Sequence, residues 1–109
     1  MTVRARGMNQ PQFKNALEYE YGLYLDALKS RGEVSWWAYE VITLKLADGA
    51  TYTPDFAVVM ADGELQFHET KGHWREAAKV RIKVAAGQTP FRFIAIKKDK
   101  RLGWKREEF

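Results

Sequence analysis

The dipeptide Asp62-Gly63, set between two apolar runs, constrains the fold of this 109-residue chain more than any other feature. An Asp-Gly link between two strand-like segments is a strong local signal for a β-hairpin. It predicts that residues 52–60 and residues 64–71 pair as antiparallel strands. The unbroken apolar run 57–60 indicates that the first of these strands is buried on both faces. The fold must therefore contain this hairpin inside its sheet.

Two amphipathic helices are predicted on either side of the strands. Apolar residues recur at three- and four-residue spacing over 11–31, and Gly32 follows as the helix stop. The second helix is predicted over 74–86, where Gly87 would cap it and Pro90 prevents its continuation.

Strand-favouring segments complete the pattern. Residues 34–46 are rich in β-branched and aromatic side chains and lead into a turn at 47–50. A short apolar strand is predicted over 91–96. The element order is therefore a helix, a three-strand meander, a second helix and a strand. This order predicts the α/β fold class, with the helices packed around a mixed sheet.

Length and composition fit one domain with its own core, because 46% of the residues are hydrophobic. The expected organisation is a flexible basic arm over 1–10, a single domain over 11–97 and a basic tail over 98–109. The chain has no cysteine, which excludes a disulfide framework and a thiolate metal site. No apolar run approaches the ~20 residues that a membrane span requires. We expect a soluble, cytoplasmic protein without a membrane partner.

Charge is distributed unevenly along the chain. Residues 1–69 contain ten acidic and six basic residues, whereas residues 70–109 contain four acidic and twelve basic residues. A basic half suits a polyanion such as nucleic acid, and an acidic half suits a cation. A protein that holds a metal ion against a phosphate needs both. A basic tail that only improves solubility would give the same pattern.

Asp55, Glu69 and Lys71 carry the strongest indication of chemistry. Side chains alternate along a strand, so Glu69 and Lys71 face the same way as the apolar Phe67. Asp55 lies seven residues before the predicted hairpin turn and Glu69 six residues after it, so pairing would bring the two carboxylates together. Oxygen ligands favour Mg²⁺ or Mn²⁺, and the main-chain carbonyl of Thr70 could complete the shell. The Lys71 ammonium could orient an attacking water.

These segments resemble the signature of the PD-(D/E)XK nucleases. Thr53-Pro54-Asp55-Phe56 and Glu69-Thr70-Lys71-Gly72 carry the resemblance, with thirteen residues between Asp55 and Glu69. The similarity extends over about 15–96 and is closest to small phage-encoded, junction-resolvase-like endonucleases. It implies a restriction-endonuclease-like core and Mg²⁺-dependent (or Mn²⁺-dependent) hydrolysis of DNA phosphodiester bonds. It also implies branched or junction DNA as the substrate, a homodimer, and a bacterial host cytoplasm.

The same family often adds an acidic residue from the first helix, and Glu18 and Glu20 are both candidates. Helical angles place Glu18 nearer the buried face, and the similar proteins carry their glutamate three residues before an aromatic, as Glu18 precedes Tyr21. We therefore prefer Glu18, although an ordinary solvent-facing glutamate is nearly as good an explanation. The catalytic set is then Asp55, Glu69, Lys71 and Glu18, and the metal set is Asp55, Glu69, Thr70 and Glu18.

Basic residues after this motif are candidates for contacts with nucleic-acid phosphates. A solvated helix face explains Lys79 or Lys83 alone better than a phosphate contact does, and ordinary surface positions explain the others equally well. The candidates are Lys79, Lys83, His73, Arg75, Lys97 and Lys98. The competing hypothesis is a catalytically inactive nucleic-acid-binding module of nuclease fold, against which the intact Asp55, Glu69 and Lys71 argue.

Overall fold

A computed structural model describes residues 13–47, 50–72 and 75–109 of the chain. Within these ranges there are two helices, α1 (Ala16–Ser30) and α2 (Glu76–Gln88), and seven strands. The strands are β1 (Val34–Tyr39), β2 (Leu44–Ala47), β3 (Ala50–Tyr52), β4 (Phe56–Met60), β5 (Leu65–Thr70), β6 (Arg92–Asp99) and β7 (Gly103–Glu108). Five of them form one sheet in the order β1-β4-β5-β6-β7, and β2 pairs with β3 in a separate ribbon.

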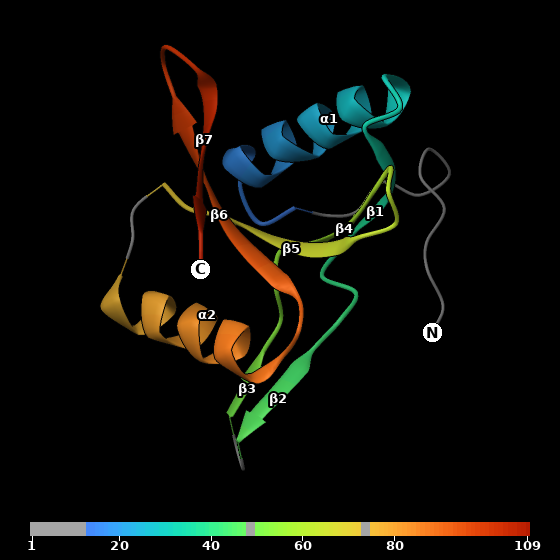
Figure 1. Ribbon diagram of the computed structural model, residues 1–109. Helices are drawn as coiled ribbons and strands as arrows, with labels where there is room; N and C mark the ends of the chain where they lie inside the picture. Colours follow the sequence, from blue (N-terminus) through green and yellow to red (C-terminus); the bar gives the residue numbers. More distant parts are fainter. Residues whose placement is uncertain (1–12, 48–49, 73–74) are drawn as a thin grey trace.

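The sheet is mixed and lies between the two helices. Strands β5 and β6 are parallel, and the other neighbours in the five-stranded sheet are antiparallel. Helix α1 covers one face and α2 the other (Figure 1). The predicted α/β class, with a mixed sheet and two helices, is confirmed. Neither α1 nor α2 is long and apolar enough to cross a membrane.

Each face of the sheet has its own hydrophobic core. On the α1 side the fully buried Tyr21 and Leu25 pack with Trp37 and Phe56. These helix residues belong to the apolar stripe predicted for 11–31, which is confirmed. On the α2 side a second cluster joins Ile82 of the helix to strand residues such as Phe67 and Phe93. Both cores are needed to hold a sheet that presents apolar side chains on both faces.

The predicted Asp62-Gly63 hairpin is confirmed. The amide of Gly63 donates to the carbonyl of Met60 at 2.9 Å, and Gly63 has a φ of 93°, which glycine adopts without strain. Strands β4 and β5 pair antiparallel with Phe56 opposite His68. Continuing this register by one residue places Asp55 opposite Glu69.

Two predicted strands are each broken in the structure, and both breaks lie at the same level. The segments 34–46 and 52–60 were each expected to be continuous, but β1 ends at Tyr39 and β4 begins only at Phe56. Glu40 has a φ of 48°, and Pro54 lacks an amide hydrogen to donate. The chain therefore bends there, and the β2–β3 ribbon packs its apolar side chains into the core on the α2 side.

Helix boundaries also differ from prediction. The structure starts α1 at Ala16, after Asn15, whose side chain accepts a hydrogen bond from the Glu18 amide as an N-cap. Helix α2 runs through Gly87 to Gln88 instead of ending at the glycine. The Thr89 hydroxyl donates to a carbonyl of the last helical turn at 3.0 Å, so a glycine cap is not required there.

The segment expected as a basic tail, 98–109, contains the end of β6 and all of β7. Asp99 accepts two main-chain hydrogen bonds across the turn, and Gly103 has a φ of 84°. Trp104 packs edge-on against Tyr21 with ring centroids 5.1 Å apart. The amide of Phe109 donates to a β6 carbonyl at 2.9 Å. The segment is therefore an integral edge of the sheet.

Candidate active site

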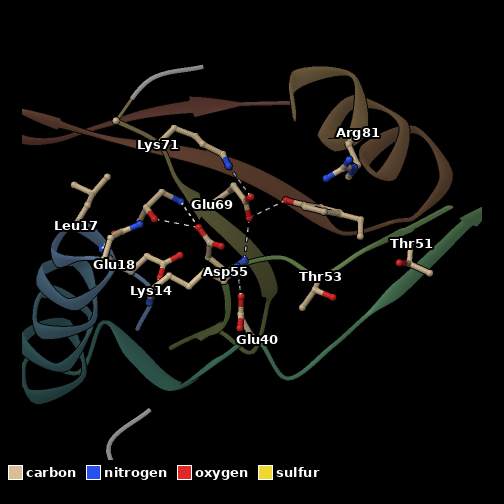
Figure 2. A pocket seen from close by; sticks show the side chains of 14 residues that line it. Lys14, Leu17, Glu18, Glu40, Thr51, Thr53, Asp55, Glu69, Lys71 and Arg81 are labelled. Atoms are coloured by element: carbon tan, nitrogen blue, oxygen red, sulfur yellow. Dashed lines mark hydrogen bonds and ion pairs between the residues drawn. The ribbon is translucent and has the colours of Figure 1, made fainter. Parts of the chain in front are cut away.

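A cavity of about 530 Å³ lies at the end of β5 and gathers every residue of the predicted catalytic and metal sets. Figure 2 shows its side chains coming from four directions: the start of α1, the β3–β4 bend, the end of β5, and α2. The predicted residues that line it are Glu18, Asp55, Glu69, Thr70 and Lys71. The bend between β3 and β4 is what presents Asp55 to this space.

Asp55 and Glu69 are held in place by hydrogen bonds to one oxygen of each carboxylate. The amide and hydroxyl of Thr70 both donate to Oδ2 of Asp55 at 3.0 Å. Oε1 of Glu69 accepts from the Asp55 amide at 2.9 Å and from the Tyr52 hydroxyl at 3.0 Å. Oδ1 of Asp55 accepts no hydrogen bond from the residues that the structure describes. The two side chains are therefore fixed while an oxygen of Asp55 is left for a ligand.

The electrostatics of the cavity favour a cation. Asp55 and Glu69 are only 5% and 8% exposed. Burial, followed by the charges of Glu69 and Glu18, raises the pKa of Asp55 to about 7, and the Thr70 bonds oppose that rise only in part. Burial and the Glu69 carboxylate also raise the pKa of Tyr52, which therefore remains a hydrogen-bond donor. Carboxylates in this arrangement repel one another until a positive charge lies between them.

Lys71 continues β5 by one residue. Its amide donates to the carbonyl of Ile96 at 2.9 Å, so the pairing with β6 extends to this position. The Nζ atom lies 3.2 Å from Oε2 of Glu69, and the side chain is half-buried. The predicted shared orientation of Glu69 and Lys71 is thus observed, and Lys71 brings a cation to the cavity edge.

Glu18 lies in the first turn of α1 and is 3% exposed. Its Oε1 accepts from the Lys14 amide at 2.8 Å and from the Tyr39 hydroxyl at 2.7 Å. Glu20, the alternative, points elsewhere and pairs with Lys98 at 2.7 Å. Of the two glutamates considered from sequence, the structure therefore brings Glu18 into the cavity.

Among the cavity residues that sequence reasoning missed are the charged Lys14, Glu40 and Arg81, together with Tyr52, which donates to Glu69. Lys14 and Glu40 form an ion pair at 2.7 Å on the α1 side of the cavity. Arg81 enters from α2 on the opposite side (Figure 2). The only available signal was for Arg81, which a helical wheel places beside the buried Ile82 face. The other three reach the cavity through the bend at Glu40 and the loop before α1.

Those candidate nucleic-acid-binding residues that the structure describes lie outside this cavity. Lys79 and Lys97 line a second groove on the same face of the sheet. Lys83 and Arg75 are exposed on α2 and at its N-cap. Lys98 pairs with α1, and His73 lies outside the described residues.

A divalent cation fits the donor set. Within the described residues, no three Asp, Glu, His or Cys side chains stand close enough to hold a metal ion by themselves. Mg²⁺ does not need three, because it usually keeps several waters and binds through one or two carboxylates. Asp55 and Glu69 provide such a pair, with Glu18 in reach of the same cavity. Oxygen donors without sulfur or imidazole match Mg²⁺ or Mn²⁺.

No protein-family model matches the sequence, and the searches of curated proteins and of solved structures likewise gave no match. A functional interpretation of this chain therefore rests on its motif and on the geometry of the cavity.

Proposed function

We propose that this protein is a Mg²⁺- or Mn²⁺-dependent endodeoxyribonuclease of PD-(D/E)XK type, with its active site in the cavity at the end of β5. The observation that supports this most directly is the convergence of three buried carboxylates and one lysine from separate elements. Burying like charges together destabilises the folded protein. Such an arrangement is common where a catalytic cation must be held.

The residues of the cavity have distinct roles in this proposal. Asp55 and Glu69 bind the cation, and Thr70 and Tyr52 fix the orientation of those two carboxylates. When bound, Mg²⁺ acts as a Lewis acid on the phosphodiester and lowers the pKa of a coordinated water. Lys71 donates from Nζ to the attacking water or to a non-bridging phosphoryl oxygen, which stabilises the negative charge that develops there. Glu18 would add a third carboxylate to the cation's surroundings on the α1 side of the cavity.

Branched DNA, such as a four-way junction, is the substrate class that we propose from the resemblance. Cutting two strands of a junction symmetrically requires two active sites, so the proposal includes a homodimer. We also assign the cytoplasm of a bacterial host as its site of action.

The experiment that tests the proposal is cleavage of plasmid, linear duplex and four-way-junction DNA with Mg²⁺, Mn²⁺ or chelator. Lys71→Met and Asp55→Asn are assayed beside the wild type, and Lys29→Met, on the far end of α1, is the matched control. We expect metal-dependent cutting that both site variants lose and the control keeps.

Preference for the junction over the linear duplex would support the proposed substrate. A folded wild type that cuts none of these substrates but binds them would overturn the enzyme proposal. That outcome would instead favour the alternative, an inactive nucleic-acid-binding module.

A further inference from the structure

Three lysines form a row across the sheet, one on each of three neighbouring strands. Thr70 pairs with Ile96 in the parallel β5–β6 register, so Lys71 and Lys97 are the next neighbours. Lys97 in turn lies directly opposite Lys105 in the antiparallel β6–β7 register. The row therefore runs from the cavity to the edge of the sheet at β7.

All three lysines lie on the face that α2 covers. Ile94 and Ile96 of β6 belong to the core on the α1 side, so the alternating Phe93 and Lys97 point to the α2 side. Lys97 and Lys105 line a groove of about 400 Å³ together with Lys79 of α2. Among the residues that the structure describes, none lines both this groove and the cavity at the end of β5. Figure 1 shows the β6–β7 hairpin at one edge of the sheet, and α2 on the face opposite α1.

The described residues that line the groove include more basic than acidic side chains. Like charges directly opposite each other on paired strands are destabilising, as Lys97 and Lys105 are. Glu107 is the carboxylate among the groove's lining residues, which otherwise carry Lys79, Lys97, Lys105 and Arg106. By contrast, Lys98, the neighbour of Lys97 on the opposite face, is neutralised by Glu20.

We propose that this lysine row is the path of a nucleic-acid backbone: one DNA strand leaves the cavity at Lys71 and crosses β6 and β7 along Lys97 and Lys105. Neighbouring strands lie about 4.8 Å apart, so the row spans about 10 Å. This is close to the axial advance of three nucleotides at about 3.4 Å each. The assignment rests on the proposed nuclease function for the identity of the polyanion. It specifies that the strand leaves the cavity towards the β7 edge of the sheet.

The test is the salt dependence of binding, measured by fluorescence anisotropy of a labelled DNA duplex in chelator, where no cutting occurs. The Lys97→Ala/Lys105→Ala pair is compared with a control pair, Lys29→Ala/Arg31→Ala, which removes the same charge at the exposed end of α1. Losing two phosphate contacts should flatten the slope of log K against log salt by about 1.8. The control pair should keep the wild-type slope. Circular dichroism confirms that both pairs are folded.

Cleavage kinetics separate this inference from the proposed function. We expect the groove pair to raise KM and leave kcat near the wild-type value, because Lys71 and the carboxylates are intact. Wild-type-like binding by the groove pair, equal losses in both pairs, or no DNA binding by the wild type would each overturn the path. If binding depends on the groove but Mg²⁺ supports no cutting, the path is retained and the nuclease proposal fails.

Discussion

The proposed active-site cavity at the end of β5 and the lysine groove on the α2 face belong to the same sheet, but their charged side chains are held in opposite ways. Asp55 and Glu69 are buried, and each has one oxygen fixed by two hydrogen bonds. Lys97 and Lys105 are exposed on the last two strands of the sheet. Bond-breaking chemistry requires oxygens at fixed positions, whereas attraction of a polyanion requires only charge of the right sign. The difference in burial matches the two tasks that we propose for these sites.

Both sites place like charges together, and each ligand would relieve its own repulsion. In the cavity the repulsion appears as the pKa of Asp55, raised to about 7 by burial and by Glu69 and Glu18. In the groove it appears as the cross-strand pairing of Lys97 with Lys105. The five predictions below test this contrast, beginning with the largest effect.

Removing a carboxylate should greatly lower kcat when the residue lies in the cavity and leave kcat unchanged when it lies in the groove. We expect Glu69→Ala to lower kcat for DNA cleavage by about 10³-fold, since it removes a cation ligand and the partner of Lys71. Glu107→Ala should retain kcat and bind DNA slightly more tightly, because it removes a negative charge from the groove. Single-turnover cleavage and anisotropy measure the two effects. Equal losses in both variants would abolish the distinction between the sites.

The two glutamates of α1 provide a second matched pair. Glu18→Gln keeps the side-chain shape but removes the charge at the cavity, so we expect activity to fall by about 10–100-fold, as for outer-sphere residues of metal sites. Glu20→Gln, which affects only the exposed pair with Lys98, should leave activity unchanged. Initial rates of DNA cleavage at saturating Mg²⁺ measure the difference between the two variants. An active Glu18→Gln enzyme would remove Glu18 from the site.

Cation binding should weaken in acid. Asp55 can bind a cation only when its carboxyl group is ionised, and its pKa of about 7 means that protons compete with the cation below neutrality. We expect the Mg²⁺ concentration for half-maximal activity to rise about tenfold for each pH unit below about 7. Calorimetry should detect proton release on Mg²⁺ binding at about pH 6 and little at about pH 8. An affinity that is constant over this range would contradict the raised pKa.

Unfolding stability should show two opposing pH dependences. Burial, with Arg106 and Arg92 nearby, lowers the pKa of His68 to about 3, and the ring accepts or donates bonds to Tyr21 and a neighbouring glutamine. Its stabilising contribution is complete above its unfolded pKa of about 6.5 and is lost as the pH falls towards 3. Asp55 has the opposite sign: its contribution is present below about 3.8 and is lost as the pH rises through 7.

The two terms therefore nearly cancel between about pH 4 and 6.5 in the wild type. In Asp55→Asn the His68 term is left alone, and the free energy of unfolding should rise with pH by about 1.4 kcal/mol per unit in this window. Urea denaturation at several pH values measures both curves. If the free energy of unfolding depends on pH in the same way in both proteins, the raised pKa is wrongly assigned to Asp55.

The smallest effect concerns the groove's own repulsion. Lys97→Glu places opposite charges across β6 and β7 and should stabilise the fold by about 0.2–1 kcal/mol while weakening DNA binding. Lys98→Glu, on the other face, puts a carboxylate beside Glu20 and should destabilise the fold slightly. The denaturation midpoints of the two variants should therefore move in opposite directions. If Lys97→Glu lowers the stability instead, the predicted repulsion between Lys97 and Lys105 is refuted.

Much of the candidate site could be predicted from the sequence because its key features are local. A turn at Asp62-Gly63 and a side-chain period of two are sufficient to bring Asp55 opposite Glu69 and to orient Lys71. The helical period placed Glu18 near the buried face of α1, where it is found. Lys14, Glu40 and Tyr52 reach the cavity only through the packing of distant segments, and no local sequence pattern reports that packing.

The sequence by itself determined the two helices, the central hairpin and the orientation of the motif side chains, because turn chemistry and periodicity act between near neighbours. Tertiary structure alone decided the bend at Glu40 and Pro54, which turns a ribbon onto the α2 side and opens the cavity. It also decided that the charged C-terminal segment is a strand. That strand is stabilised by hydrogen bonds to β6 and by Trp104 packing on α1, contacts that exist only once the rest of the sheet has formed.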